Sequence, residues 1–273
     1  MKKPLVKVDF LKDSTKSSKN NSRRKFIKMS GLGIAGSSFL LYGCSDDDNF
    51  DPGGDVGNPD PMEPEEPETP ENPENPEPQV FDLGSGDLGI LNYAYALEQL
   101  EAAFYTAVRG GDYYAGAPQE EKDLFDDLYN HEVIHRELFR TAIAGVTADN
   151  PDAMLPDLEF DLSSVDLTSR DSVLATSQAL EDTGVGAYNG AGDRISNVDY
   201  LVLAGKIVSV EARHASAIRS LINPDSADFA GDDVIDENGL DLAYEPSTVF
   251  ENAGPFIATD FTANNLPEPM TGA

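Results

Sequence analysis

The chain has 273 residues, with 50 acidic and 19 basic side chains and a formal net charge of -31. Such a negative charge argues against binding to nucleic acids or to anionic lipid surfaces, which attract basic proteins. The single cysteine, Cys44, excludes an internal disulfide bond.

The first 43 residues have the features of an export signal. Ten of the 19 basic residues lie before Met29, and the segment Ser22–Lys28 contains paired arginines followed by phenylalanine. The modestly apolar run that follows, Gly31–Gly43, is too short to cross a bilayer as a helix. This pattern resembles a twin-arginine signal peptide, a class that exports folded proteins, often with their cofactors. Residues 1–43 are therefore predicted to be a twin-arginine lipoprotein signal peptide.

The end of this segment, Leu41-Tyr42-Gly43-Cys44, resembles a lipoprotein cleavage site, although Tyr42 is bulkier than the usual residue there. Cleavage would leave Cys44 as a lipidated N-terminus, which makes the membrane an expected partner. The alternative is an ordinary secretion signal with an incidental cysteine. Ser45–Asp48 resembles the acidic signal that routes some Gram-negative lipoproteins to the outer face of the outer membrane. We therefore expect an outer-membrane lipoprotein of the cell envelope, whose domain could face the cell surface.

The next segment, residues 44–82, is predicted to be a disordered acidic stalk. Between Ser45 and Pro78 there are thirteen Asp or Glu, nine Pro and no Lys or Arg. Such a composition cannot bury enough apolar surface to fold, and its charges repel one another. At about 3.1 Å per residue, the stalk could hold a domain as far as roughly 100 Å from a membrane. After cleavage the chain would keep nine basic and 48 acidic residues.

Apolar residues then recur with helical spacing in four long stretches, which predicts a helical domain over residues 83–223. Ser169 and Asn197 are predicted to cap the third and fourth helices. The stretch Gly145–Thr168 is too long for a hairpin turn, so we expect a crossover there. Residues 224–273 are predicted to be an extension that packs on the domain, with a short helix near 247–252. The four predicted long helices cover residues 87–109, 118–144, 169–191 and 197–222.

Two of these helices carry the same motif, Glu-x-x-His, at Glu132–His135 and Glu211–His214. These motifs contain two of the only three histidines in the chain. Residues three apart lie on one face of a helix about one turn from each other, so each carboxylate and imidazole can converge on one ion. The repeated spacing predicts a metal site.

The other two helices each carry a glutamate on an apolar stripe, preceded by leucine and followed seven residues later by tyrosine. They are Glu98 with Tyr105, and Glu181 with Tyr188. The lone glutamate precedes the paired one by 34 residues in one half and by 30 in the other, which indicates two related helical hairpins. Carboxylates buried together in an apolar bundle repel one another unless cations neutralise them.

These motifs resemble the ferritin-like di-iron or di-manganese carboxylate proteins, in which a four-helix bundle supplies one Glu from each of two helices and Glu-x-x-His from the others. Leu91–Tyr105 and Leu180–Tyr188 are similar, more narrowly, to the ferritin-like-domain family that includes desiccation-related proteins. The resemblance implies an all-α four-helix bundle that binds two iron or manganese ions. The ligands that it implies are Glu98, Glu132, His135, Glu181, Glu211 and His214.

Several roles stay open at this stage. Glu101 lies one helical turn from Glu98 and is an alternative ligand, although Glu98 has the matching leucine and tyrosine. Tyr105 and Tyr188 fit packed core tyrosines better than redox partners. His131 points away from the ligand stripe, as a surface residue or one that supports a ligand. The functional hypothesis is a lipid-anchored di-metal protein that reacts with dioxygen or peroxide; the alternative is a non-catalytic structural, stress-protection or metal-binding lipoprotein.

Overall fold

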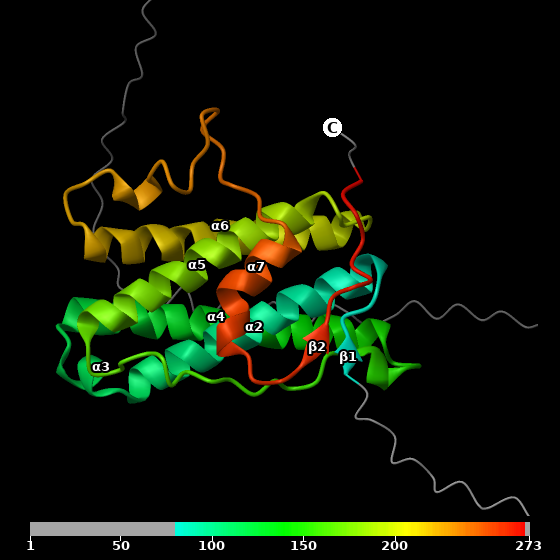
Figure 1. The fold of residues 1–273 in the computed structure, drawn as a ribbon, viewed down its shortest axis with the longest axis horizontal. Helices are drawn as coiled ribbons and strands as arrows, with labels where there is room; N and C mark the ends of the chain where they lie inside the picture. Colours follow the sequence, from blue (N-terminus) through cyan, green and yellow to red (C-terminus); the bar gives the residue numbers. More distant parts are fainter. Residues whose placement is uncertain (1–79, 271–273) are drawn as a thin grey trace, which may run out of the picture. The chain divides into compact units, whose positions relative to one another are not determined.

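The computed structural model describes residues 80–270 (Figure 1). The export signal, Cys44 and nearly all of the predicted acidic stalk lie outside the described residues. Within residues 80–270, no helix is both long enough and apolar enough to cross a membrane.

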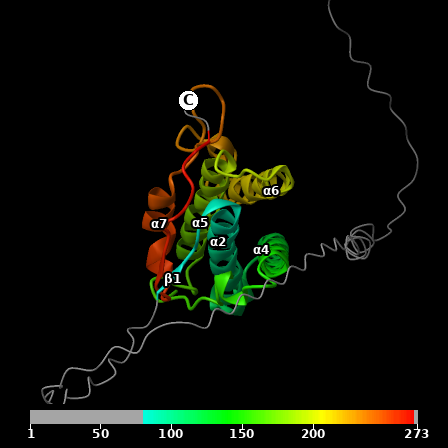
Figure 2. The same ribbon diagram turned by 90° about the vertical axis from the view of Figure 1, so that its right-hand side faces the viewer.

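Four long helices form the bundle, and the all-α prediction is confirmed. Helix α2 packs along α4, helix α5 packs along α6, and α2 contacts α5 at the centre (Figures 1 and 2). Each helix begins and ends within two residues of the limits predicted from apolar spacing. Their bounds are Gly86–Gly110 for α2, Gln119–Val146 for α4, Arg170–Gly192 for α5 and Val198–Ile222 for α6.

Both predicted helix caps are present. The hydroxyl of Ser169 accepts a hydrogen bond from the backbone N–H of Ser172 at the start of α5. The amide oxygen of Asn197 accepts from the N–H groups of Asp199 and Tyr200 at the start of α6. Each cap satisfies backbone donors that have no partner inside the first helical turn.

Shorter elements connect and cover the bundle. Helix α3, Asp112–Gly116, links α2 to α4, and the 3-10 turn η1, Pro151–Ala153, lies in the crossover. The C-terminal part contains η2, Asp228–Ala230, helix α7, Pro246–Ala253, and η3, Gly254–Phe256. Two very short strands, β1 at Phe81–Asp82 and β2 at Phe261–Thr262, pair in parallel with Phe81 opposite Phe261.

Helix α2 is buried on nearly all sides, whereas its sequence stripe alone predicted one buried face. The crossover between α4 and α5 covers part of the remaining surface, and two buried amides hold it there. Asn92 donates to the carbonyl oxygens of Leu83 and Ala153 and accepts from the N–H of Leu155. Gln99, seven residues further along the same helix, donates to the carbonyl oxygen of Pro156 and accepts from the N–H of Leu158. These bonds satisfy crossover groups that would otherwise be buried without partners.

Helix α7 of the C-terminal segment lies against α5, on the side away from α4 and α6 (Figure 2), whereas η2 packs on α6. The C-terminal segment also approaches α5 closely at Tyr244, whose N–H donates to the carbonyl oxygen of Gly186 at 2.9 Å. A side chain at Gly190 would put its Cβ only 1.9 Å from the carbonyl oxygen of Tyr244, so this contact requires glycine.

Two buried arginines tie the same segment to the bundle. Arg219 of α6 forms ion pairs with Asp182 of α5 and Asp233 of the C-terminal segment. Arg194 pairs with Glu245 and donates to the carbonyl oxygen of Pro267. Because these arginine side chains are only 5 % exposed, their pairing also neutralises charge that would be costly to bury alone.

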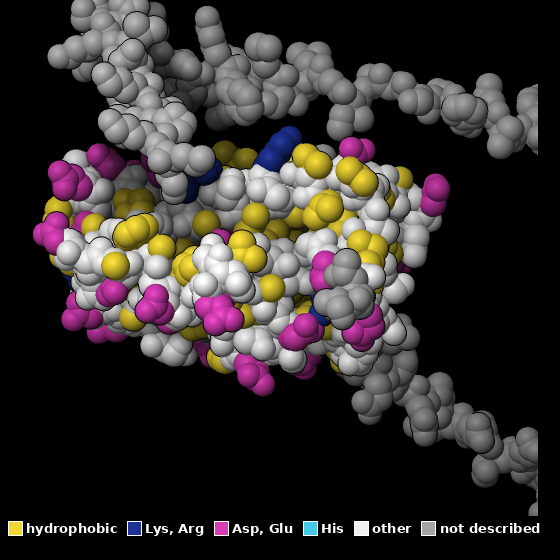
Figure 3. Space-filling view, turned by 90° about the horizontal axis from the view of Figure 1, so that it is seen from above, with side chains coloured by type: hydrophobic (Ala, Val, Ile, Leu, Met, Phe, Trp, Pro, Cys, Tyr) yellow, Lys and Arg dark blue, Asp and Glu magenta, His cyan; other side chains and the backbone are white. Residues whose placement is uncertain are grey.

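On the side of the domain where α6 lies, exposed hydrophobic side chains are found between acidic ones (Figure 3). Among the exposed hydrophobic residues of α6 are Val198, Leu201 and Val202. This face of the domain is therefore less uniformly acidic than the net charge of the chain suggests.

Candidate metal centre

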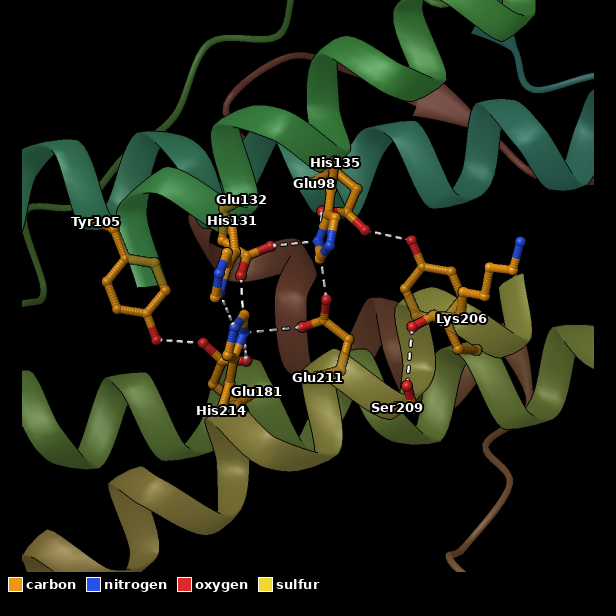
Figure 4. Close-up of polar contacts among 11 residues, drawn as sticks. Glu98, Tyr105, His131, Glu132, His135, Glu181, Lys206, Ser209, Glu211 and His214 are labelled. Carbon is orange, nitrogen blue, oxygen red and sulfur yellow. Dashed lines mark hydrogen bonds and ion pairs between the residues drawn. The ribbon is translucent and has the colours of Figure 1, made fainter. Parts of the chain in front are cut away.

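The six residues expected to bind metal converge in the middle of the bundle (Figure 4). Glu98 comes from α2 and Glu181 from α5, while α4 and α6 each contribute one Glu-x-x-His pair. The four glutamate side chains are fully buried, and the two imidazoles are 10 % and 6 % exposed. The structure thus brings together side chains that are up to 116 positions apart in the sequence.

The donor atoms form two overlapping groups that could each hold a metal ion, with ligand atoms within 4.8 Å of one another in each group. Glu132 and Glu211 belong to both groups. The remaining members differ, which defines two positions: position A has Glu98 and His135, and position B has Glu181 and His214.

Each imidazole directs its Nδ1 atom at the carboxylates. Nδ1 of His135 lies 3.1 Å from Glu211 Oε1, 3.2 Å from Glu132 Oε2 and 3.4 Å from Glu98 Oε2. Nδ1 of His214 lies 2.9 Å from Glu132 Oε1 and 3.2 Å from Glu181 Oε2. The nitrogen and oxygen lone pairs of each position therefore converge on one region.

The two outer glutamates are held by tyrosines from the opposite hairpin. Tyr105 of α2 donates its hydroxyl to Oε1 of Glu181, and Tyr188 of α5 donates to Oε1 of Glu98. In each case the other carboxylate oxygen, Oε2, is left to face the centre. The tyrosines thus fix both the rotation of a carboxylate and the oxygen that it presents.

The fit of this cluster to metal ions rests on its unsatisfied atoms. Within the described part of the chain, six buried atoms of the cluster make no hydrogen bond: Glu98 Oε2, Glu132 Oε1, Glu181 Oε2, both carboxylate oxygens of Glu211, and His214 Nδ1. Buried polar atoms nearly always have a partner, and six of the nine buried side-chain atoms without one in the described residues belong to predicted ligands. Oxygen and imidazole donors in this number suit divalent cations such as iron or manganese.

The pKa values of the carboxyl groups report how strongly they are packed together. Burial, with repulsion from Glu211, raises the pKa of Glu132 to about 8. Burial likewise raises the pKa of Glu181 to about 7. Burial also acts on Glu211, but His135 and His214 overcome it and lower the pKa of this carboxyl to about 2.

The pKa values of both imidazoles are raised. Burial acts to lower the pKa of His135, but Glu132, Glu211 and Glu98 raise it to about 12. The pKa of His214 is also raised, against the effect of burial, by Glu181 and Glu132. Without metal, protons on the imidazoles and carboxyls therefore supply the positive charge that this cluster requires.

Glu101, the alternative ligand of the first helix, is buried beside the two groups but is not a member of either. Burial raises its pKa well above the usual range, with further contributions from Glu211 and Glu132. Its carboxylate occupies space opposite Gly184, where an added Cβ would lie 3.1 Å from Glu101 Oε1. The choice of Glu98 or Glu101 as the ligand therefore stays a prediction.

Sequence reasoning did not identify Gly184, although a signal for it was present. Gly184 follows Glu181 by three residues, as Glu101 follows Glu98 by three in the related hairpin. A small residue at the position that corresponds to an acidic one indicates that only one hairpin contributes a carboxylate there.

The third histidine is not a simple surface residue. His131 is half-buried, and its Nδ1 lies 2.9 Å from Nε2 of His214, with the two rings parallel within 7°. This contact fits the second of the two roles predicted for His131, a residue that supports a ligand. The sequence did not reveal which ligand, because the partner comes from α6.

Comparison with known proteins adds one finding. The sequence model described as a ferritin-like domain matches residues 86–224, which extend from the start of α2 to just beyond the end of α6. No protein with curated annotation matches the chain. The matched residues include all four bundle helices and every member of the two ligand groups.

Proposed function

Because the chain belongs to the ferritin-like family, we propose that its buried cluster binds two divalent metal ions, iron or manganese, and uses them in redox chemistry. The observation that carries the proposal is the sharing of Glu132 and Glu211 by two groups of inward-facing donors. Two ions at positions A and B would offset the charge of four glutamates and take up the lone pairs that lack hydrogen-bond partners.

The donor chemistry narrows the metal to hard or borderline cations. The cluster offers carboxylate oxygens and imidazole nitrogens but no sulfur, since the only cysteine is Cys44. Copper and zinc bind such donors more tightly than iron or manganese wherever they are available. Folding around iron or manganese before export by the twin-arginine route would avoid that competition.

Iron or manganese bound there would supply a change of oxidation state toward dioxygen or a peroxide. An apolar pocket next to the cluster would admit a molecule of this size, although none of the six predicted ligands lines it. It lies beside Tyr188, holds about 20 Å³ and is lined mainly by side chains such as Leu91, Leu97 and Phe139. This volume corresponds to about one water-sized molecule, so the pocket suits a diatomic molecule better than a bulky organic substrate.

The protein's own groups have separate tasks in this scheme. Tyr105 and Tyr188 orient the outer carboxylates, and the full burial of the four glutamates excludes bulk water from the centre. The two imidazoles keep a small exposed edge. Protons displaced from His135 and His214 by metal would leave through this edge.

The decisive experiment starts from the full chain freed of metal and loaded anaerobically with iron(II) or manganese(II). We expect two ions per chain, uptake of oxygen by the iron form, and decomposition of hydrogen peroxide by one of the two forms. Two bound ions without either reaction would reject the redox function and favour the non-catalytic alternative. Failure to bind any ion would reject the metal centre itself.

We also propose that the protein is anchored to the cell envelope through lipid on Cys44, with the acidic stalk as a spacer. The support is the order of the sequence features: paired arginines, an apolar run, a solitary cysteine and an acidic Pro-rich stretch. Mass spectrometry of the mature N-terminus should find cleavage before Cys44 and a lipid-modified thiol. An unmodified or uncleaved Cys44 in protein purified from membranes would reject the anchor.

A further inference from the structure

His131 reaches the metal centre from the solvent side, across the space between α4 and α6. Its Nδ1 atom lies 2.9 Å from Nε2 of His214, and the ring centroids are 5.1 Å apart with an angle of 7° between the planes. The contact therefore joins a residue outside the two ligand groups to a predicted ligand on the neighbouring helix.

The contact involves the nitrogen of His214 that faces away from the carboxylates. His214 directs Nδ1 at Glu132 and Glu181, at 2.9 and 3.2 Å. A neutral imidazole has one N–H group and one lone pair, so an ion bound by Nδ1 requires the proton on Nε2. That proton points at Nδ1 of His131, which must then accept it and keep its own proton on Nε2.

His135, the other ligand imidazole, has no histidine at the matching position of α6 to form such a hydrogen bond. His131 precedes His135 by four residues on α4, and the residue that precedes His214 by four on α6 is Val210. Valine has no side-chain atom that could accept a hydrogen bond from an imidazole. The two hairpins match at their Glu-x-x-His motifs but differ at this position, so only His214 has a histidine partner of this kind.

We propose that His131 is a positioning residue that fixes the ring of His214 and makes metal position B inequivalent to position A. This inference rests on the proposed function, since it assumes that ions bind between the carboxylates. A hydrogen bond to the remote nitrogen of a ligand imidazole holds its orientation and makes it a stronger donor. Position B should therefore bind an ion more tightly than position A.

The small number of histidines allows a direct test. The full chain contains only three, all in this cluster, so labelling histidine with ¹⁵N gives three sets of ring signals. With zinc(II) as a diamagnetic probe, we expect His214 to be metal-bound at Nδ1 and protonated at Nε2, with that proton exchanging slowly. The variant His131→Ala should speed this exchange and leave the ring signals of His135 unchanged.

Zinc titration of the same proteins supplies the second readout. Loss of a second-shell partner typically weakens metal binding about 10- to 100-fold, and we expect His131→Ala to do this at one of the two positions. The variant His131→Asn should restore most of the affinity, because an amide oxygen can accept from Nε2 near the place of the lost Nδ1. The exposed neighbour Asn130 gives the matched control, and Asn130→Ala should change neither readout.

Three results would overturn the proposal: an unchanged His214 ring in His131→Ala, equal weakening of both positions, or no recovery in His131→Asn. Wild-type protein that binds no zinc would instead reject the proposed metal centre, and this outcome is visible before any variant is made. A variant that binds zinc at both positions with wild-type affinities would leave the metal centre in place and reject only the role of His131.

Discussion

Tyr105 of α2 donates its hydroxyl hydrogen to Glu181 of α5, a residue of the other hairpin. The reciprocal bond runs from Tyr188 of α5 to Glu98 of α2. These bonds pair a later residue of one helix with an earlier residue of the other, which is the pattern of antiparallel neighbours. Each hairpin therefore orients the outer ligand of the other, and the two metal positions depend on the packing of α2 against α5.

This crossed arrangement predicts which position each tyrosine supports. Tyr105→Phe should weaken binding at position B, and Tyr188→Phe should weaken it at position A, each by about 10- to 100-fold. In the metal-free protein, loss of the hydroxyl leaves a buried carboxylate oxygen without its donor, which should cost about 1–3 kcal/mol of unfolding free energy. Metal titration and urea unfolding of the full chain measure the two effects.

Tyr95 provides the matched control for these substitutions. It is a fully buried tyrosine of α2 whose hydroxyl is directed at Asp157 of the crossover, away from both ligand groups. Tyr95→Phe should leave both metal affinities unchanged. If Tyr105→Phe instead weakens position A, the assignment of the crossed bonds is incorrect.

The helices of the bundle could be predicted from the sequence because the limits and the caps of each helix depend on residues within that helix or next to it. Apolar spacing set the limits of the helices, and the caps at Ser169 and Asn197 were recognisable from residue type and position. The crossed tyrosine bonds were not predictable in this way. A spacing of seven places Tyr105 on the stripe of Glu98 but about 10 Å further along the helix, and its partner depends on the direction of the neighbouring helix.

The near-complete burial of α2 was also beyond sequence reasoning. Asn92 and Gln99 are polar and would be placed at a surface, yet both are buried because they bond to the backbone of a crossover more than 50 residues away. The contact of His131 with His214 has the same origin, since its partner lies 83 residues later. Such features arise from packing between segments and leave no local pattern.

The choice between Glu98 and Glu101 leads to a second prediction. Glu98 is a member of the position A group and receives the hydroxyl of Tyr188, whereas Glu101 belongs to neither group. Glu98→Ala should therefore abolish binding at one position, while Glu101→Ala should leave two ions bound. Metal analysis after loading and desalting measures the number of ions directly. Loss of an ion in Glu101→Ala with two retained in Glu98→Ala would reverse the assignment.

A third prediction concerns the crossover. Asn92→Ala removes hydrogen bonds to Leu83, Ala153 and Leu155, and two of these residues, Leu83 and Leu155, are fully buried. We expect the unfolding free energy to fall by roughly 3 kcal/mol, as measured by urea unfolding. Asn130→Ala, at an exposed site of α4, should change it by less than about 0.5 kcal/mol. Similar effects of the two substitutions would show that Asn92 does not hold the crossover.

A fourth prediction follows from the carboxyl groups of the metal-free centre. The folded protein raises the pKa of Glu132 to about 8 and of Glu181 to about 7. The unfolded chain has values near 4.3, so between these limits the folded state holds more protons than the unfolded state. The stability that these groups contribute is therefore present below about pH 4 and is lost as the pH rises toward 8. His135, with its pKa raised to about 12, adds a further loss above about pH 6.5.

Metal should reverse this trend, because ions bind the deprotonated ligands and become more effective as the pH rises. Between pH 5.5 and 8, the unfolding free energy of metal-free protein should fall by on the order of 5 kcal/mol or more, and the stabilisation by manganese(II) should grow. Thermal and urea unfolding across this range, with chelator or with metal, measure both slopes. The double variant Glu132→Gln/Glu181→Gln is the control, since neutral amides cannot titrate and should flatten the metal-free slope. A slope that persists unchanged in this variant would show that Glu132 and Glu181 do not cause the pH dependence and would leave it to the imidazoles.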